Sequence, residues 1–426
     1  MKKESFKSSI AKIIFLLLIF GVLGFFYSII FRPQKEISIE ENRTLQKIPS
    51  FSMRDFADGT YQKQMEDSIG DQFLFSIQIK YGVKQVFNQL TNAFSKINYK
   101  NEEMPVTAES AANQSLNQSE NMHENLPVVQ IENTPHYTYK EVVANKLYKL
   151  DDSGYIVEKP HAPEEYCFEL YDPAMLAAVT YPKYLFFIYN SEATDFNDLK
   201  KYNAFDYIKK QMPMTGYDCL SYNSFEEYKK YFYQTDHHWN YYGSYIGYTK
   251  IMKMLEGQEV ELLVPTGIHV YDTVYNGSLA RDNLLRCATE KFTVYEYNLP
   301  PYKTYVNDEE KEYGYRSYYV SDEDFPHKTY ANHYGMYYGD DWAKVVYDFN
   351  QPEKENLLIL GTSFTNSVNE LIASHYNKTH VLDFRYYRKQ YGQRIDAQSY
   401  MTENNISKMV IIGNISSLGF KIKSQQ

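Results

Sequence analysis

The first stretch of the chain that stands out is an uncharged apolar run over residues 13–31, IIFLLLIFGVLGFFYSIIF. Its length matches the apolar core of a bilayer, so it predicts one transmembrane helix after a short tail, residues 1–12.

Four lysines lie in this tail: Lys2, Lys3, Lys7 and Lys12. The positive-inside rule then places the N-terminus in the cytoplasm. A cleaved signal peptide is the alternative, but it requires a shorter apolar stretch and a small-x-small cleavage site, which the run lacks.

The pattern changes twice after the predicted anchor. Residues 36–98 show helical spacing of apolar residues, which predicts an extracytoplasmic helical segment that packs on the main domain. One face repeats at steps of three and four: Phe75, Ile79, Val83, Val86 and Leu90. Residues 101–135 are rich in Asn, Gln, Ser and Glu and contain no aromatic residue. Such a composition buries too little apolar surface to offset the entropy of ordering, so it predicts a disordered polar loop.

Residues 137–426 alternate between short apolar runs and segments with helical spacing. Near the start of this region, 184–189 predicts a buried strand, and 225–232 and 241–255 predict helices. The clearest unit comes last: strands over 356–360, 380–384 and 408–412, a turn over 361–364, a helix over 366–375 and the end of a helix over 399–404. Alternating strands and helices predict an α/β domain with a mostly parallel sheet and right-handed crossovers.

Polar residues follow the three C-terminal strands. Ser363, Arg385 and Asn414 come just after the predicted strand ends, and ligands of such sheets bind at the carboxyl edge. A serine at a strand-to-helix turn is well placed as a nucleophile, because the turn exposes its oxygen beside the N–H groups that begin a helix. The alternative is structural, since Thr362 or Ser363 is equally suited to cap the helix.

A nucleophilic serine needs a base, and Asp236 and His238 are candidates to supply it. On an extended or looped segment, their spacing of two places both side chains on one side, where the carboxylate orients the imidazole. A metal site built from Asp236, His237 and His238 is an alternative, but further ligands are lacking nearby. A purely structural role for the histidine is the other alternative.

Composition narrows the classes of function. The chain carries 44 basic and 54 acidic residues, a net charge of −10, which argues against nucleic acid as a partner. Tyrosine is frequent, with 44 residues against 2 tryptophans. This suits a surface that binds sugars but is equally explained by a compositional bias. Cys167, Cys219 and Cys287 form no C-x-x-C pattern, so we expect either three buried thiols or one bridge and one thiol rather than a metal site.

Several blocks together resemble a known family. The chain contains Asp236-His237-His238-Trp239 upstream and Gly361-Thr362-Ser363-Phe364 downstream. Further blocks match in order: Glu41-Asn42-Arg43, Pro49, Asp71-Gln72-Phe73, Asn276-Gly277-Ser278-Leu279, Tyr337-Tyr338-Gly339-Asp340 and Asp383-Phe384-Arg385-Tyr386-Tyr387. This order resembles the DHHW family and the related alginate O-acetyltransferases of the AlgX and AlgJ types.

The resemblance implies a three-layer SGNH-hydrolase-like fold with a circularly permuted motif order, in which the Asp-His pair precedes the serine. It implies Ser363 as nucleophile, His238 as base and Asp236 as the residue that orients the base. Further oxyanion or substrate contacts are implied for Asn414, Arg385, Tyr386 and Trp239. Trp239 would either stack on a sugar or pack beneath the His238 loop.

Two positions depart from the family pattern. Relatives have glycine where this chain has Arg385 or Tyr386, and aspartate where it has Thr362. The Thr362 hydroxyl would still be able to cap the following helix.

The function implied is transfer of an acetyl group to a cell-surface or exported polysaccharide by a membrane-anchored, extracytoplasmic enzyme. The expected partners are the polysaccharide and a multi-spanning membrane acyltransferase that supplies the acyl group, with no cofactor. Two alternatives stay open: an esterase that uses the same triad, and a non-catalytic polysaccharide-binding or assembly protein.

Overall fold

The computed structural model describes residues 43–57, 59–72, 136–144, 146–162, 166–168, 173–283, 285, 287–311, 331–418 and 420–422, with single positions or pairs at 20, 24, 27, 33–34, 37–38 and 83. The anchor predicted over 13–31 lies outside these residues apart from Phe20, Gly24 and Tyr27, and the predicted loop 101–135 lies wholly outside them. Within the described ranges, no helix has both the length and the apolar character needed to cross a membrane.

One mixed sheet of eight strands forms the centre of the main domain. In spatial order the strands are β12 (Glu309–Glu310), β11 (Lys303–Val306), β13 (Lys344–Asp348), β15 (Lys378–Leu382), β14 (Asn356–Leu360), β16 (Ile406–Gly413), β7 (Lys183–Ile188) and β8 (Gly216–Leu220). The last five of these run parallel. The first three extend the sheet by antiparallel pairing. The predicted α/β class with a mostly parallel sheet is therefore confirmed.

The five parallel strands are connected in an unusual chain order. Counted from β14, their order across the sheet is 2-1-3-4-5, which is one of the two common orders of doubly wound sheets. The fourth and fifth strands, β7 and β8, nevertheless come first in the chain. This connectivity is the one expected for a permuted motif order, because it places the segment after β8 upstream of the serine after β14.

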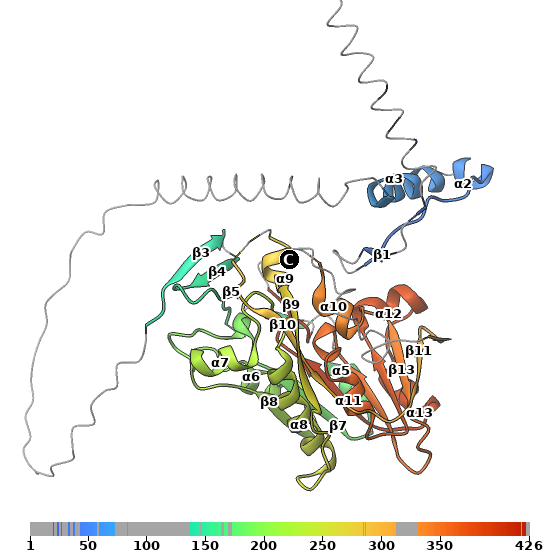
Figure 1. The fold of residues 1–426 in the computed structure, drawn as a ribbon. Helices are drawn as coiled ribbons and strands as arrows, with labels where there is room; N and C mark the ends of the chain where they lie inside the picture. The colour runs from blue at the N-terminus through green and yellow to red at the C-terminus, as the bar shows by residue number, and fades with distance from the viewer. Residues whose placement is uncertain are drawn as a thin grey trace, which may run out of the picture.

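Helices cover both faces of this sheet and make three layers (Figure 1). On one face, α7 (Phe225–Tyr231), α8 (Tyr241–Glu256) and α11 (Asn369–Ala373) pack on strand residues such as Phe186 and Ile359. On the other face, α5 (Pro173–Ala178), α6 (Ala204–Gln211), α12 (Phe384–Tyr391) and α13 (Ala397–Glu403) pack on the intervening residues, such as Phe187 and Leu358. Because successive strand residues point to opposite faces, burial on both sides explains the uninterrupted apolar runs of the sequence.

Smaller elements surround the carboxyl edge of the sheet. They are the antiparallel ribbon of β9 (Gly267–Val274) and β10 (Lys291–Glu296), the short helices α9 (Ser278–Arg281) and α10 (His333–Tyr338), the 3-10 turns η2 (Ser191–Ala193) and η3 (Ser363–Thr365), and the three-stranded sheet of β3 (Tyr139–Val143), β4 (Leu147–Leu150) and β5 (Ile156–Glu158). β6 (Tyr166–Phe168) pairs with β17 (Phe420–Ile422). Aromatic side chains from the ribbon and α10 form a separate buried cluster that supports the loops of this edge.

Nearer the N-terminus, the structure describes two two-residue strands and two helices. They are β1 (Ile37–Ser38), β2 (Arg43–Thr44), α2 (Met53–Ala57) and α3 (Thr60–Gln72). The apolar face predicted over 75–90 lies outside the described residues except for Val83. Elsewhere, Cys219 and Cys287 are free, half-buried thiols, while the side chain of Cys167 lies outside the description.

Most of the predicted elements of the main domain occur near their expected positions, and two are displaced. β15 begins at Lys378 and ends at Leu382, whereas we expected 380–384. The strand ends early because Asp383 caps α12, its Oδ1 accepting a hydrogen bond from the Arg385 N–H at 2.9 Å. The helix expected over 366–375 is confined to Asn369–Ala373, since residues 366–368 form a turn that follows η3.

Candidate active site

Ser363 lies directly after the central strand of the sheet. β14 ends at Leu360, and Ser363 opens the turn η3 after two loop residues. The loop between β14 and η3 passes close to Thr365 and to β16, and this requires Gly361. A Cβ at this position would lie 2.3 Å from Thr365 Cγ2 and 3.1 Å from the Ile412 carbonyl oxygen. The half-buried serine is therefore presented at the carboxyl edge of the sheet. It stands at the start of a helical turn whose first N–H groups have no partner within the turn.

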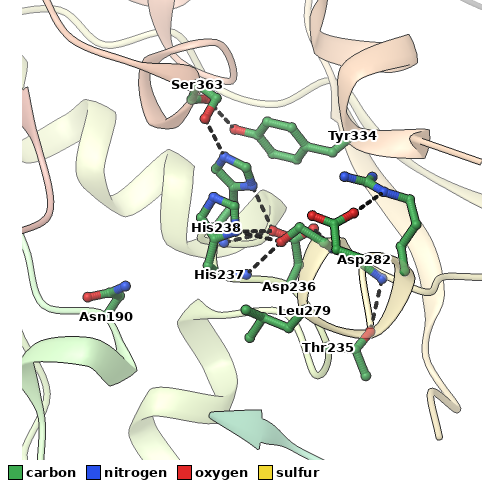
Figure 2. A network of polar contacts seen from close by, with 12 residues as sticks. Asn190, Thr235, Asp236, His237, His238, Leu279, Asp282, Tyr334 and Ser363 are labelled. Carbon is green, nitrogen blue, oxygen red and sulfur yellow. Dashed lines mark hydrogen bonds and ion pairs between the residues drawn. The ribbon is translucent and has the colours of Figure 1, made fainter. Parts of the chain in front are cut away.

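His238 connects this serine to a carboxylate. Its Nε2 lies 2.9 Å from Ser363 Oγ, and its Nδ1 lies 2.7 Å from Asp236 Oδ1 (Figure 2). An ionised carboxylate only accepts hydrogen bonds, so it places the imidazole hydrogen on Nδ1 and leaves Nε2 to accept from the serine hydroxyl. The three residues predicted from the sequence are thus brought together in the arrangement of a Ser-His-Asp triad.

Asp236 is a buried carboxylate that accepts four hydrogen bonds. Its Oδ1 accepts from the ring Nδ1 and, at 2.9 Å, from the backbone N–H of His238. Its Oδ2 accepts from the Tyr275 hydroxyl at 2.7 Å and the Ser278 N–H at 2.6 Å. Burial alone would raise the pKa of Asp236, but the neighbouring His238 and the bonds it donates outweigh burial and hold that pKa well below its usual value. The carboxylate therefore stays ionised and can stabilise a protonated His238.

The segment after β9 holds the loop that carries Asp236. The Gly277 N–H donates to Thr235 Oγ1 at 3.0 Å, and the Ala280 N–H donates to the Thr235 carbonyl oxygen at 3.2 Å. Gly277 itself packs on the carboxylate, since a Cβ at this position would lie 2.2 Å from Asp236 Cβ. The Asn276–Leu279 block of the sequence resemblance therefore has a structural role, because its glycine and its serine N–H shape the site of Asp236.

His237 lies beside the triad without joining it. Its Nδ1 is 2.5 Å from Ser278 Oγ, and 30% of its side chain is exposed. Burial and the neighbouring His238 lower the pKa of His237 to about 3 although Asp236 acts in the opposite direction. His237 is thus a neutral side chain at the edge of the site.

The same three residues form the one group of possible metal ligands in the part of the chain that the structure describes. The ligand atoms of Asp236, His237 and His238 lie within 4.8 Å of one another. These atoms already have other partners: both carboxylate oxygens accept hydrogen bonds, and the two nitrogens of His238 face Asp236 and Ser363. The donor set therefore fits a triad better than a metal centre.

Asn414 follows β16, and its side-chain amide is directed toward Glu192. Its Nδ2 lies 3.3 Å from Glu192 Oε2 and 3.1 Å from Ser416 Oγ, so both amide hydrogens are directed to these partners. Near Glu192, burial and the Glu192 charge raise the pKa of Glu158 to about 8, and the Asn190 amide donates to Glu158 at 3.3 Å. The predicted oxyanion role of Asn414 stays a prediction, and it requires the amide to leave one of its present partners.

Arg385 and Tyr386 lie on the other side of the central strand, at the start of α12. The Arg385 guanidinium bonds to Asp383 at 3.0 Å and to Asp341 at 2.9 Å, and it lies 5.1 Å from the ring centroid of Tyr386. Arg385 is thus paired with two carboxylates, and 35% of its side chain is exposed. A substrate role for either residue stays a prediction.

No protein-family model matches the sequence, and no curated protein is significantly similar to it. Solved structures do match. PatB1 of Bacillus cereus, solved with a sulfonyl adduct, is 20% identical with a TM-score of 0.46, over 64% of this chain and 95% of PatB1. A DHHW family protein of Eubacterium siraeum is 14% identical with a TM-score of 0.48, over 67% and 95%. The O-acetyltransferase domain of Pseudomonas putida AlgJ is 11% identical with a TM-score of 0.32, over 66% and 93%.

The chain resembles DHHW and AlgJ-type proteins. This resemblance rests on the sequence motifs, above all on Asp236-His237-His238-Trp239 and Gly361-Thr362-Ser363-Phe364. Trp239, the tryptophan of the Asp-His-His-Trp string, lies in the core of the domain.

Trp239 is fully buried, and its Nε1 donates to Ser367 Oγ at 2.8 Å. It packs against Gly247, where a Cβ would lie 2.3 Å from the ring. The prediction that Trp239 binds substrate is therefore wrong, because the ring cannot reach a sugar. The alternative, packing beneath the His238 loop, is confirmed.

Thr362, one of the positions that depart from the expected family pattern, also differs from expectation in its contacts. It is buried at the N-cap position of η3, but its side chain makes no capping hydrogen bond. Its carbonyl oxygen instead accepts from Thr365 Oγ1 at 3.0 Å. The proposed capping role of the Thr362 hydroxyl is therefore wrong.

Two tyrosines of the candidate site were not predicted from the sequence. Tyr275 donates to Asp236, and Tyr334 donates to the Ser363 carbonyl oxygen and stacks on His238. Both lie far in sequence from the residues that they contact, and the abundance of tyrosine hid them. The one available signal was that Tyr275 immediately precedes the Asn276–Leu279 block.

Glu290 supports the base of the Asp236 loop and gives stability a pH dependence. Its Oε1 accepts from the Gln234 N–H at 2.6 Å, and burial raises the pKa of Glu290 to about 8. The pKa in the unfolded chain is about 4.3, so the folded chain binds more protons between these two values. The contribution of Glu290 to the free energy of unfolding therefore falls as the pH rises from about 4 to about 8.

Replacing Glu290 by glutamine is expected to weaken this pH dependence. The amide oxygen still accepts from Gln234, and no charge has to be buried above pH 8. Since a one-unit difference in pKa between the folded and unfolded chain is worth about 1.4 kcal/mol, we expect Glu290→Gln to stabilise the protein by at least about 1 kcal/mol at pH 8.5. Urea unfolding at pH 5 and pH 8.5 measures this. The exposed Glu353 provides the control, and a Glu290→Gln profile parallel to that of Glu353→Gln would contradict the assignment.

Proposed function

We propose that this protein is a membrane-anchored, extracytoplasmic O-acyltransferase that acetylates a polysaccharide through an acyl-enzyme on Ser363. The single observation that carries the proposal is the bridge made by His238, 2.9 Å from Ser363 Oγ and 2.7 Å from Asp236 Oδ1. This arrangement activates a hydroxyl for attack on an acyl carbon. The order of the motifs and of the strands supports a permuted SGNH-hydrolase-like domain, and the resemblance to DHHW and alginate O-acetyltransferase proteins supports the choice of acyl group and acceptor.

The first half-reaction forms the acyl-enzyme. His238 Nε2 takes the proton from Ser363 Oγ as the oxygen attacks the carbonyl carbon of the acyl donor. Asp236 stabilises the imidazolium that results. The N–H groups that open η3 face no intrahelical acceptor and can hold the oxyanion, with Asn414 as a second donor if its amide turns from Glu192. Collapse of the intermediate breaks the bond to the leaving group, which receives the proton from His238.

The second half-reaction repeats these steps with a sugar hydroxyl as nucleophile. His238 takes the hydroxyl proton, the sugar oxygen attacks the acyl carbon, and the proton returns to Ser363 Oγ as the ester on the serine breaks. The predicted anchor over 13–31 would keep the domain at the outer face of the membrane. A multi-spanning acyltransferase in the same membrane would supply the acyl group there, and the acceptor would be a cell-surface or exported polysaccharide.

The test is formation of a covalent adduct. The full-length protein in detergent is incubated with p-nitrophenyl acetate and analysed by intact mass and peptide mapping. We expect one acetyl group on Ser363, no adduct with Ser363→Ala, and a loss of at least about 10³-fold in rate with His238→Ala. A folded wild-type protein that gains no acetyl group, or gains it elsewhere, would contradict the proposal and favour a non-catalytic binding protein.

The acceptor is identified by product analysis with and without added polysaccharide. Acetylated polymer supports transfer to a sugar hydroxyl. Release of free acetate at the same rate with and without polymer supports an esterase that uses the same triad. Both results require Ser363, so this experiment decides only the second half-reaction.

A further inference from the structure

We propose that Tyr334 is a positioning residue of the triad, which orients His238 through ring stacking and the Ser363 turn through a hydrogen bond. This role rests on the proposed function, because it concerns the same serine and histidine. Tyr334 lies outside the DHHW string and the serine turn. It reaches the triad from α10, which precedes β14 in the chain.

The helix that carries Tyr334 is firmly placed. Asn332 caps α10, with its Oδ1 accepting from the Gly335 N–H at 3.1 Å and from Arg281 Nη1 at 2.8 Å. Arg281 belongs to α9, which follows the Gly277 segment against Asp236. The position of Tyr334 in the first turn of α10 is therefore tied to the element that supports the carboxylate. The tyrosine is 3% exposed and has little freedom to move.

The first contact of Tyr334 is with the imidazole of His238. The two rings are stacked with centroids 4.0 Å apart and planes 7° from parallel. Figure 2 shows Tyr334 alongside His238, with both side chains reaching toward Ser363. The stacking fixes the tilt of the imidazole, so Nε2 stays aimed at Ser363 Oγ. The electron-rich ring face also favours a cation, so it stabilises the imidazolium formed when His238 takes the serine proton.

The second contact is with the backbone of the nucleophile. The Tyr334 hydroxyl donates to the Ser363 carbonyl oxygen at 3.1 Å. The peptide that joins Ser363 to Phe364 is planar and trans, so its N–H points away from its carbonyl oxygen. By holding the carbonyl, Tyr334 sets the direction of the Phe364 N–H, one of the groups that open η3. Burial raises the pKa of Tyr334 far above its ordinary value, so the hydroxyl keeps its proton and remains a donor.

A purely structural role makes different predictions from a positioning role. Tyr334 also packs against Tyr338, with ring centroids 4.9 Å apart, and belongs to the aromatic cluster of the ribbon and α10. Loss of packing alone would lower stability and leave the pKa of His238 unchanged. Tyr337 is a matched control, because it lies in the same helix and cluster and packs against Phe292 and Tyr271.

The charges near His238 define the background for a pKa measurement. Asp236 contacts the ring on its own loop, and the neutral His237 lies beside it. Arg281 of α9 and Arg385 of α12 act on the neighbouring His237. All of these groups are unchanged in variants of Tyr334, so a change in the pKa of His238 reports the stacked ring.

The experiment compares full-length wild type, Tyr334→Phe, Tyr334→Leu and Tyr337→Phe. Acylation of Ser363 by p-nitrophenyl acetate is followed between pH 5 and 9, and the pKa of His238 is measured by NMR on histidine-labelled protein. We expect Tyr334→Phe to acylate about five- to ten-fold more slowly with the pKa of His238 unchanged. We expect Tyr334→Leu to be slower still, with that pKa lowered by about half to one unit. Tyr337→Phe should match wild type in both measurements.

Two results would overturn the proposal. One is a folded Tyr334→Leu with the wild-type pKa of His238 and the wild-type pH profile. The other is a Tyr334→Phe as fast as wild type, which decides the matter even if Tyr334→Leu does not fold. If wild type forms no adduct, the proposed function fails, but the NMR comparison still tests the stacking on its own.

Discussion

Replacing Asp236 by asparagine is expected to slow acylation of Ser363 by about 10⁴-fold without unfolding the protein, as in related triads. The amide oxygen of asparagine can still accept from the Tyr275 hydroxyl and the Ser278 N–H, which now bond to Oδ2. The amide nitrogen then faces His238 and donates to Nδ1. The imidazole hydrogen moves to Nε2, where it points at Ser363, and the ring can no longer accept the serine proton.

The rate of adduct formation by intact mass measures this effect. Asp282→Asn is the matched control, because Asp282 is a half-exposed aspartate close to the site that pairs with Arg281. Its rate should stay within about two-fold of wild type. An Asp236→Asn protein within ten-fold of wild type would show that the carboxylate does not orient the base.

Replacing Gly277 by alanine is expected to slow acylation about 100-fold and to lower the free energy of unfolding by about 1–3 kcal/mol. The backbone at Gly277 has φ −68° and ψ −177°, which alanine adopts easily. The cost is steric, since the new Cβ would lie 2.2 Å from Asp236 Cβ and 2.7 Å from Asp236 Cα. The Asp236 loop must move, and His238 moves with it.

Adduct rates and urea unfolding together test this prediction. Gly257→Ala is the control: Gly257 has φ +94° and nothing within 4 Å of its Cβ position, so alanine there costs about 1–3 kcal/mol of stability through backbone strain without touching the site. Its acylation rate should equal that of wild type. If Gly277→Ala acylates as fast as Gly257→Ala, the close packing on Asp236 is not required for the reaction.

The parts of the site that sequence reasoning located are determined by local patterns. The apolar run of β14 predicted where Ser363 would follow a strand, and the spacing of Asp236 and His238 predicted that they would lie on one side of their loop. β15 was placed two residues late because it begins with polar residues. Thr379 is nevertheless buried, since pairing with β13 and β14 decides its environment rather than its own polarity.

The remaining parts depend on contacts between distant segments. A tyrosine that donates to Asp236 or stacks on His238 looks, in sequence, like any of the 44 tyrosines of the chain. The direction of a side chain was equally hidden: Trp239 is adjacent to His238 yet points into the core, and the Asn414 amide turns to Glu192. Position along the chain did not reveal these orientations.

The permuted connection of the sheet has a consequence for biosynthesis. β7, β8 and the loop that carries Asp236 and His238 are synthesised before β14, β15 and β16. Ser363 follows β14. β14, β15 and β16 supply the centre of the sheet and span Asn356 to Gly413. A chain that emerges N-terminus first therefore carries Asp236 and His238 before Ser363 and the strands around it have been made. Under the proposed function, a chain truncated before β16 has no acylating activity, because β16 is the strand that joins β14 to β7 in the sheet.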